Sequence, residues 1–113
     1  MGSGHGAIAD NRIGATSDDG AVLIHPLIIG ELACGNLADR DPTLELLRQL
    51  RPATVAEHDE VMGHIVARRL YGRGIGYVDA HLLASASIDG AQLWTLDKRL
   101  GAIAVEFGMA LQR

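Results

Sequence analysis

The sequence predicts an α/β domain with a small, mostly parallel sheet flanked by helices. Short β-prone runs and longer helical stretches follow one another in the order strand, helix, helix, strand, helix, helix, strand, helix. Alternation of this kind is typical of parallel strands joined by helical crossovers. Apolar residues make up 48% of the 113 residues, which is enough for the core of one domain. Aromatic residues make up only 4%, so the chain lacks the stacking platform common in proteins that bind single-stranded nucleic acid.

Residues 1–20 are expected to form a flexible leader or tag-like segment, and residues 21–113 the folded domain. The first 20 residues contain many glycines, and the pair Asp18-Asp19 precedes Gly20 as a turn signal. No basic region followed by an apolar run is found there, so we do not interpret this segment as a secretory signal.

The first half of the domain is expected to contain two strands and two helices. Residues 21–25 are apolar and β-prone, which predicts a buried strand. Pro26 opens a helix that extends to about residue 37, because proline is well tolerated at the first helical position. The pair Asp41-Pro42 repeats this arrangement as the cap and first residue of a second helix. Residues 54–56 are expected to form the second strand.

The second half begins with negative charge at residues 57–60, which favours the first turn of a helix because of the helix dipole. A Gly-rich joint at residues 71–76 separates that helix from a long apolar helix over residues 77–88. Residues 91–95 are expected to form a strand and residues 98–107 the last helix. A short final strand is expected at about residue 110.

Three acidic residues lie where a parallel sheet would bring them together. Glu31 lies in the first turns of the helix after the first strand, Asp79 in the first turn of the long apolar helix, and Asp97 just past the strand at 91–95. Functional sites of open α/β sheets gather outside the carboxyl ends of the strands. Converging carboxylates repel one another, and Mg²⁺ or Mn²⁺ relieves that repulsion. Such ions promote phosphodiester hydrolysis, so these acids are the candidate metal ligands and catalytic residues.

Each acid also has a structural explanation that the sequence leaves open. Asp79 is equally a first-turn residue that interacts with the helix dipole. Asp97 is equally the cap of the helix that begins at Lys98. A structural salt bridge explains Glu31 less well, because no lysine or arginine is near it in the sequence.

Three stretches of the sequence resemble the successive motifs of VapC-type PIN-domain toxins. They are residues 30–32, 72–84 and 93–100, and each contains one of the three acids. The resemblance extends over about residues 22–109, in the family's order and spacing.

The resemblance implies a PIN-like three-layer sandwich and an endoribonuclease that is inhibited by a cognate antitoxin. Glu31, Asp79 and Asp97 would then be catalytic and would hold Mg²⁺ or Mn²⁺, and a metal-activated water would hydrolyse RNA. Thr95 matches a position where the family often has a hydroxyl close to the site.

The sequence departs from the family at its start. The family begins with a hydrophobic strand that ends in an aspartate and lies in the middle of the sheet, and here that strand is missing or replaced. Residues 7–11, with Asp10, are only a faint echo of it. The loss would remove one metal ligand and leave a gap in the core, which rearranged packing or a second chain would fill. A homodimer is therefore expected. The alternative function is a truncated, catalytically inactive PIN domain that acts only as a binding or dimerisation module.

The net charge of −4 implies that any contact with nucleic acid is local. Arg73, Lys98 and Arg99 flank the three acids in the sequence and, with Thr95, are the candidate substrate-binding residues. Solvated helix ends are an equally open explanation for the cations. A metal-dependent phosphoesterase unrelated to the family is a further possibility, which would cleave a small ester and leave structured RNA untouched.

The remaining polar signals favour no other chemistry. Cys34 is the only cysteine, so neither an intrachain disulfide nor a Cys-based zinc site is possible, and a cytoplasmic location is expected. No apolar run is long enough to span a membrane. The Gly-rich joint at residues 71–76 does not follow a strand and is not a nucleotide-binding loop. His81 is expected to be a partly buried polar residue rather than a metal ligand.

Overall fold

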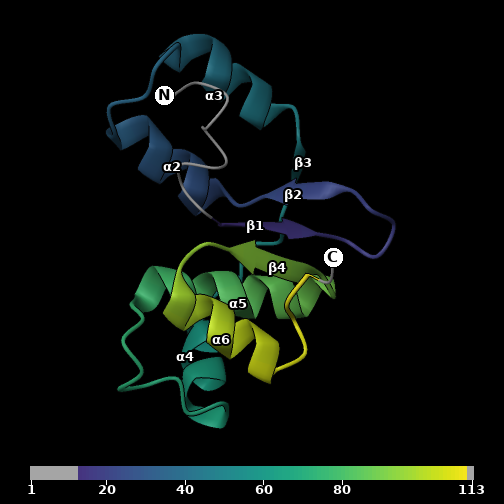
Figure 1. Cartoon of the computed structure of the whole chain (residues 1–113), viewed down its shortest axis with the longest axis vertical. Helices are drawn as coiled ribbons and strands as arrows, with labels where there is room; N and C mark the ends of the chain where they lie inside the picture. The colour runs from purple at the N-terminus through teal and green to yellow at the C-terminus, as the bar shows by residue number, and fades with distance from the viewer. Residues whose placement is uncertain (1–12, 112–113) are drawn as a thin grey trace.

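The computed structural model describes residues 13–111 and shows an α/β domain built on one mixed four-stranded sheet (Figure 1). Asp10 lies outside the described residues. Along the chain the elements are β1 (Ile13–Thr16), β2 (Val22–Ile24), α2 (Pro26–Cys34), α3 (Arg40–Arg48), β3 (Arg51–Pro52), α4 (His58–Ala67), α5 (Tyr77–Asp89), β4 (Gln92–Thr95) and α6 (Lys98–Glu106).

The strands lie in the order β3-β2-β1-β4. The strand β1 is antiparallel to both of its neighbours, whereas β2 and β3 are parallel and Ala110 forms a parallel bridge with Leu93. All the strands except β1 therefore run in the same direction. The prediction of a mostly parallel sheet is wrong for the pairings of β1, because a short turn joins β1 to β2 and two strands joined in this way must be antiparallel.

The strand β1 lies within the stretch predicted to be a leader, and the structure places residues 13–16 in the centre of the sheet (Figure 1). Gly14 pairs with Trp94, and a Cβ atom built on Gly14 would lie only 2.0 Å from the ring carbon Cζ2 of Trp94. The indole thus occupies the space that a side chain would need. The expected gap in the middle of the sheet is filled by this strand of the same chain, which runs in the direction opposite to the one the family resemblance implies.

The strand predicted at residues 54–56 is found instead at β3. Its two residues pair with Leu23 and Ile24 of β2, and the amide of Ala53 donates a hydrogen bond of 2.8 Å to the carbonyl oxygen of Ile24. The apolar character of residues 54–56 reflects packing at Ala56, which is buried against the core, rather than strand pairing.

The helices form two groups with the sheet between them in the view of Figure 1. In that view α2 and α3 lie beyond β2, and α4, α5 and α6 gather beside β4. The predicted negative start of α4 forms a capping box between Glu57 and Glu60, in which the Glu57 amide donates a hydrogen bond of 2.8 Å to the Glu60 carboxylate. No helix in the described part of the chain has the length and apolar character needed to cross a membrane.

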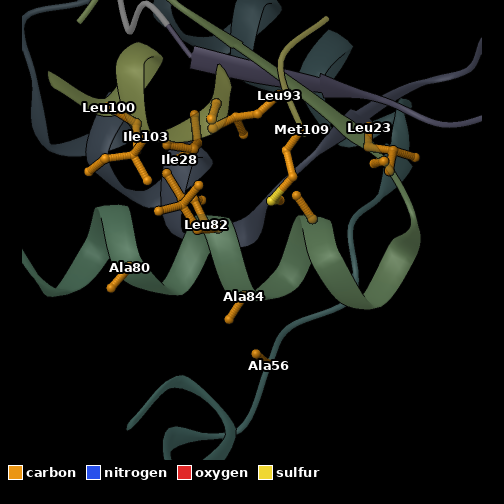
Figure 2. Packing of buried hydrophobic residues seen from close by; sticks show 14 of the residues in the cluster. Leu23, Ile28, Ala56, Ala80, Leu82, Ala84, Leu93, Leu100, Ile103 and Met109 are labelled. Atoms are coloured by element: carbon orange, nitrogen blue, oxygen red, sulfur yellow. The ribbon is translucent and has the colours of Figure 1, made fainter. Parts of the chain in front are cut away.

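The core is built around α5, whose residues 80–86 are all buried. A helix that is buried over nearly two turns must have neighbours on all sides. Figure 2 shows Leu82 of α5 close to Leu93 of β4 and to Leu100 and Ile103 of α6, in the same cluster of buried residues. The burial of α5 fixes the position of its first turn, which carries Asp79.

Candidate active site

The carboxyl ends of β2 and β4 lie at one edge of the sheet. Both strands are antiparallel to β1, in a register that pairs Ala15 with Leu23 and Ile13 with Thr95. The helices α2 and α6 begin directly after these strand ends, and Figure 1 shows the start of α5 on the same side of the molecule. Three helix N-termini therefore face one edge, which is where sites of open α/β sheets lie.

Asp79 lies in the first turn of α5, and its side chain is half-buried. Burial raises the pKa of the Asp79 carboxyl, and the negative charge of Asp97 raises that pKa further, against the opposing effect of a hydrogen bond from the Gly76 backbone. The two aspartates, 18 positions apart in the sequence, are thus close enough to interact electrostatically. Burial is the larger cause of the raised pKa of Asp79, and the charge of Asp97 adds to it.

Asp97 is the N-cap of α6. Its Oδ1 atom accepts a hydrogen bond of 2.9 Å from the amide of Leu100, so the predicted capping role is confirmed. Its own amide donates a hydrogen bond of 3.0 Å to the hydroxyl of Thr95. Within residues 13–111 the Oδ2 atom of Asp97 has no hydrogen-bond partner. Capping therefore uses one carboxylate oxygen and holds the group in place, while the second oxygen is available to a ligand.

Glu31 is exposed on the middle of α2. In the part of the chain that the structure describes, its carboxylate forms neither a salt bridge nor a hydrogen bond. The described residues also contain no group of three or more His, Cys, Asp or Glu side chains close enough to hold a metal ion. The three acids therefore do not form one metal-holding group: the charge of Asp97 acts on Asp79, and that of Glu31 is not among the causes of the Asp79 pKa shift.

The candidate substrate-binding cations have different surroundings. Arg73 forms an ion pair with Glu106, with 2.7 Å between Nη2 and Oε1. Lys98 and Arg99 are the first two residues of α6 and are exposed. Arg99 folds back across Gly74 in the loop before α5. The three side chains that the sequence presents as equivalent therefore differ in how far their charge is already neutralised.

Sequence reasoning missed a cluster of ring side chains next to this edge. His25 is the N-cap of α2: its Nδ1 atom accepts a hydrogen bond of 3.1 Å from the Leu27 amide, and its Nε2 atom lies 3.0 Å from the Ser85 hydroxyl. Burial and the neighbouring His81 lower the pKa of His25 to about 4. Its place directly before a proline that opens a helix is the signal that points to a capping role.

His81 lies between the rings of His25 and Tyr77, with centroid distances of 5.0 and 5.8 Å. The residue is 7% exposed, so His81 is buried more deeply than the sequence predicts. Both ring nitrogens are buried without a hydrogen-bond partner among the described residues. An apolar setting of this kind is costly for an imidazole, because buried polar groups are normally hydrogen-bonded.

The comparisons with known proteins agree with the chain's resemblance to a ribonuclease family. No family model matches the sequence, and no solved structure matches it. Ribonuclease VapC32 of Mycobacterium tuberculosis is 48% identical to it over 108 residues, in each of the strains CDC 1551 / Oshkosh and ATCC 25618 / H37Rv. The match covers 95% of this chain and 87% of the relative. Such identity over almost the whole length shows common descent, and the chain therefore belongs to the VapC ribonuclease family.

Proposed function

We propose that this protein is a Mg²⁺-dependent endoribonuclease of the VapC toxin type, which hydrolyses RNA phosphodiester bonds and is inhibited by a cognate antitoxin. Membership of the VapC family supports ribonuclease activity. The observation that carries the metal-dependent part is the repulsive pairing of Asp79 with Asp97 at the edge where three helices begin.

The two aspartates fit a hard divalent cation. A half-buried carboxylate whose pKa is raised by burial and by a second carboxylate is relieved by positive charge. Mg²⁺ is commonly held by one or two carboxylates together with water and substrate phosphate oxygens, so Asp79 and Asp97 are a sufficient protein contribution. Mn²⁺ prefers the same oxygen ligands. The family resemblance implies Glu31 as a third acid, whereas the described residues contain no group of three such side chains close enough to hold a metal ion.

The residues around the aspartates prepare the site for a phosphodiester. The Thr95 hydroxyl and the Leu100 amide hold Asp97 in one orientation. The N-termini of α5 and α6 carry partial positive charge, which favours an anionic phosphate group at this edge. A bound Mg²⁺ would supply Lewis-acid chemistry, activating water and stabilising the leaving oxygen. In this proposal Lys98 and Arg99 contact the RNA backbone, whereas the guanidinium of Arg73 is engaged in its ion pair with Glu106.

A cleavage assay tests this function. The wild-type protein is incubated with a defined pool of single-stranded RNA in Mg²⁺, in Mn²⁺ and in EDTA, beside Asp79→Asn and the control Asp41→Asn. Asp41 is an exposed residue of α3, so its substitution makes the same change of charge away from the aspartate pair. We expect cleavage in both metals, none in EDTA, and a loss of roughly 100-fold or more for Asp79→Asn alone. Cleavage that is indifferent to EDTA, or an Asp79→Asn variant as active as wild type, would refute the proposal.

A catalytically inactive binding or dimerisation module is the second candidate, and the separation of Glu31 from the aspartate pair favours it. This candidate predicts that Mg²⁺ does not raise the melting temperature and that Asp79→Asn does not alter the response. The enzyme proposal predicts a metal-dependent rise that Asp79→Asn removes, since a ligand that binds only the folded state stabilises it.

The proposed partners are RNA, a cognate antitoxin and a second copy of the chain, and the proposed location is the cytoplasm. Family membership supports the first two. The exposed apolar side chains of Met62 and Val66, one turn apart on α4, support an additional protein contact. Size-exclusion chromatography with light scattering tests for a homodimer, and co-expression with a candidate antitoxin tests for the inhibitor.

A further inference from the structure

Arg99 lies directly on the backbone of Gly74. A Cβ atom built on Gly74 would lie 2.8 Å from Cδ of Arg99 and 3.0 Å from its Nη1 atom. Both the aliphatic stem and the guanidinium of Arg99 therefore cross the loop at this point. Gly74 also has a φ of +84°, a backbone conformation that side-chain-bearing residues adopt only under strain. Both the close approach of Arg99 and the positive φ therefore favour glycine at position 74.

This crossing lies at the border of the aspartate pair. Gly74 is two residues before Gly76, whose backbone is hydrogen-bonded to Asp79. Arg99 is two residues after Asp97, in the first turn of α6. The side chain therefore connects the two segments that carry the coupled aspartates, and it places a guanidinium beside the start of α5.

The charge of Arg99 is not neutralised within residues 13–111, where it forms no ion pair with a carboxylate. Arg73, by contrast, is paired with Glu106 at 2.7 Å. A guanidinium offers a planar set of donors that matches two oxygens of one phosphate group. An unpaired guanidinium that is held against a loop loses less side-chain entropy on binding than a freely rotating one.

We propose that Arg99 binds a backbone phosphate of the RNA at the aspartate pair, and that Gly74 is the positioning residue that lets it lie there. This inference rests on the proposed ribonuclease function. It gives Arg99 a different role from Arg73, because the guanidinium of Arg73 is already paired with Glu106 and holds the loop to α6.

The first test measures binding of a labelled single-stranded 2′-O-methyl RNA oligonucleotide by fluorescence anisotropy, in Mg²⁺ and at several salt concentrations. Arg99→Gln is compared with Arg48→Gln, which removes the same charge from α3, where Arg48 pairs with Glu45. We expect Arg99→Gln to weaken binding about tenfold and to reduce the slope of log affinity against log salt by about 0.7, the value for one phosphate contact on a single strand. Arg48→Gln keeps the wild-type slope, and thermal melting verifies that both variants are folded.

The second test is a double-mutant cycle with Gly74→Ala. If Gly74 acts by positioning Arg99, Gly74→Ala weakens binding in the wild-type background and has little further effect in the Arg99→Gln background. Equal effects of Gly74→Ala in both backgrounds would overturn the positioning role.

The outcomes separate this inference from the proposed function. A wild-type protein that cleaves RNA while Arg99→Gln retains both affinity and salt slope overturns the assignment of Arg99 and leaves the ribonuclease intact. A wild-type protein that neither binds nor cleaves RNA overturns both.

Discussion

Asp79 and Asp97 repel each other across the starts of two helices: burial is the main cause of the raised pKa of Asp79, and the charge of Asp97 adds a smaller increase. The Asp97 carboxylate accepts a hydrogen bond from the Leu100 amide, which caps α6 and fixes the orientation of that carboxylate. The pair therefore combines Asp79, whose charged form is disfavoured, with Asp97, whose carboxylate is held by the helix cap. Five predictions follow from this arrangement and from the core around it.

Asp79→Asn is expected to raise the melting temperature of the metal-free protein at pH 7. The folded-state pKa of Asp79 is raised, so its contribution to stability is complete below the unfolded pKa near 3.8 and is lost as pH rises through the folded pKa. Removing the charge removes that cost. The same variant should lose the Mg²⁺-dependent rise in melting temperature, and differential scanning fluorimetry with and without EDTA measures both effects.

Two substitutions should distinguish the capping role of Asp97 from its role in binding metal. Asparagine caps helices about as well as aspartate, so Asp97→Asn should keep the wild-type stability and lose the response to Mg²⁺. Asp97→Ala also loses the hydrogen bond from Leu100 and should cost about 1 kcal/mol of unfolding free energy. Urea denaturation of the two variants measures the difference, and equal stabilities would contradict the capping role.

The lowered pKa of His25 should make the protein less stable in mild acid than at neutral pH. Its folded pKa of about 4 lies below the unfolded value of 6.5, so the unfolded state binds more protons between those values. Stability should rise with pH across that window and be complete above pH 6.5. Protonation of Nδ1 would also break the hydrogen bond from Leu27.

The control for this prediction is His25→Asn, which can still cap α2 but does not titrate. Urea denaturation between pH 4.5 and 7 should show a shallower pH dependence for this variant than for wild type. If the two proteins have the same pH dependence, another group is responsible for the acid sensitivity.

The position of β1 in the sheet is tested at Gly14. Gly14→Ala forces a Cβ atom to within 2.0 Å of the Trp94 ring, so we expect it to cost about 2 kcal/mol or more and to alter the tryptophan fluorescence. Gly63→Ala is the matched control, because Gly63 is exposed in α4 with no atom within 4 Å of the added Cβ. That change should be stabilising by up to about 1 kcal/mol. A neutral Gly14→Ala would mean that β1 does not pack against Trp94.

The buried imidazole of His81 is expected to reduce stability. Both ring nitrogens lack a hydrogen-bond partner among the described residues. His81→Leu replaces them with an apolar group of similar size and should raise the unfolding free energy by about 1 kcal/mol. A loss of stability in that variant, measured by chemical denaturation, would show that the ring is hydrogen-bonded in solution.

The sequence by itself determined the features that depend on contacts within a few residues. Pro26 at the start of α2 and the strand that ends at Thr95 were predicted correctly, and the capping role of Asp97 was one of the two explanations that the sequence left open. Such signals are local, because a cap or a fixed proline φ is satisfied inside one helical turn. The family resemblance had the same basis, since its motifs lie around the three acids.

Only the tertiary structure decided what fills the centre of the sheet and which acids meet. Residues 13–16 carry no strong strand pattern, and they form β1 because Gly14 and its neighbours pair with β4 far along the chain and make room for Trp94. The coupling of Asp79 with Asp97, and the separation of Glu31 from them, likewise depend on where whole helices pack. Strand pairing and helix packing are set by the burial of distant residues, which no short stretch of sequence encodes.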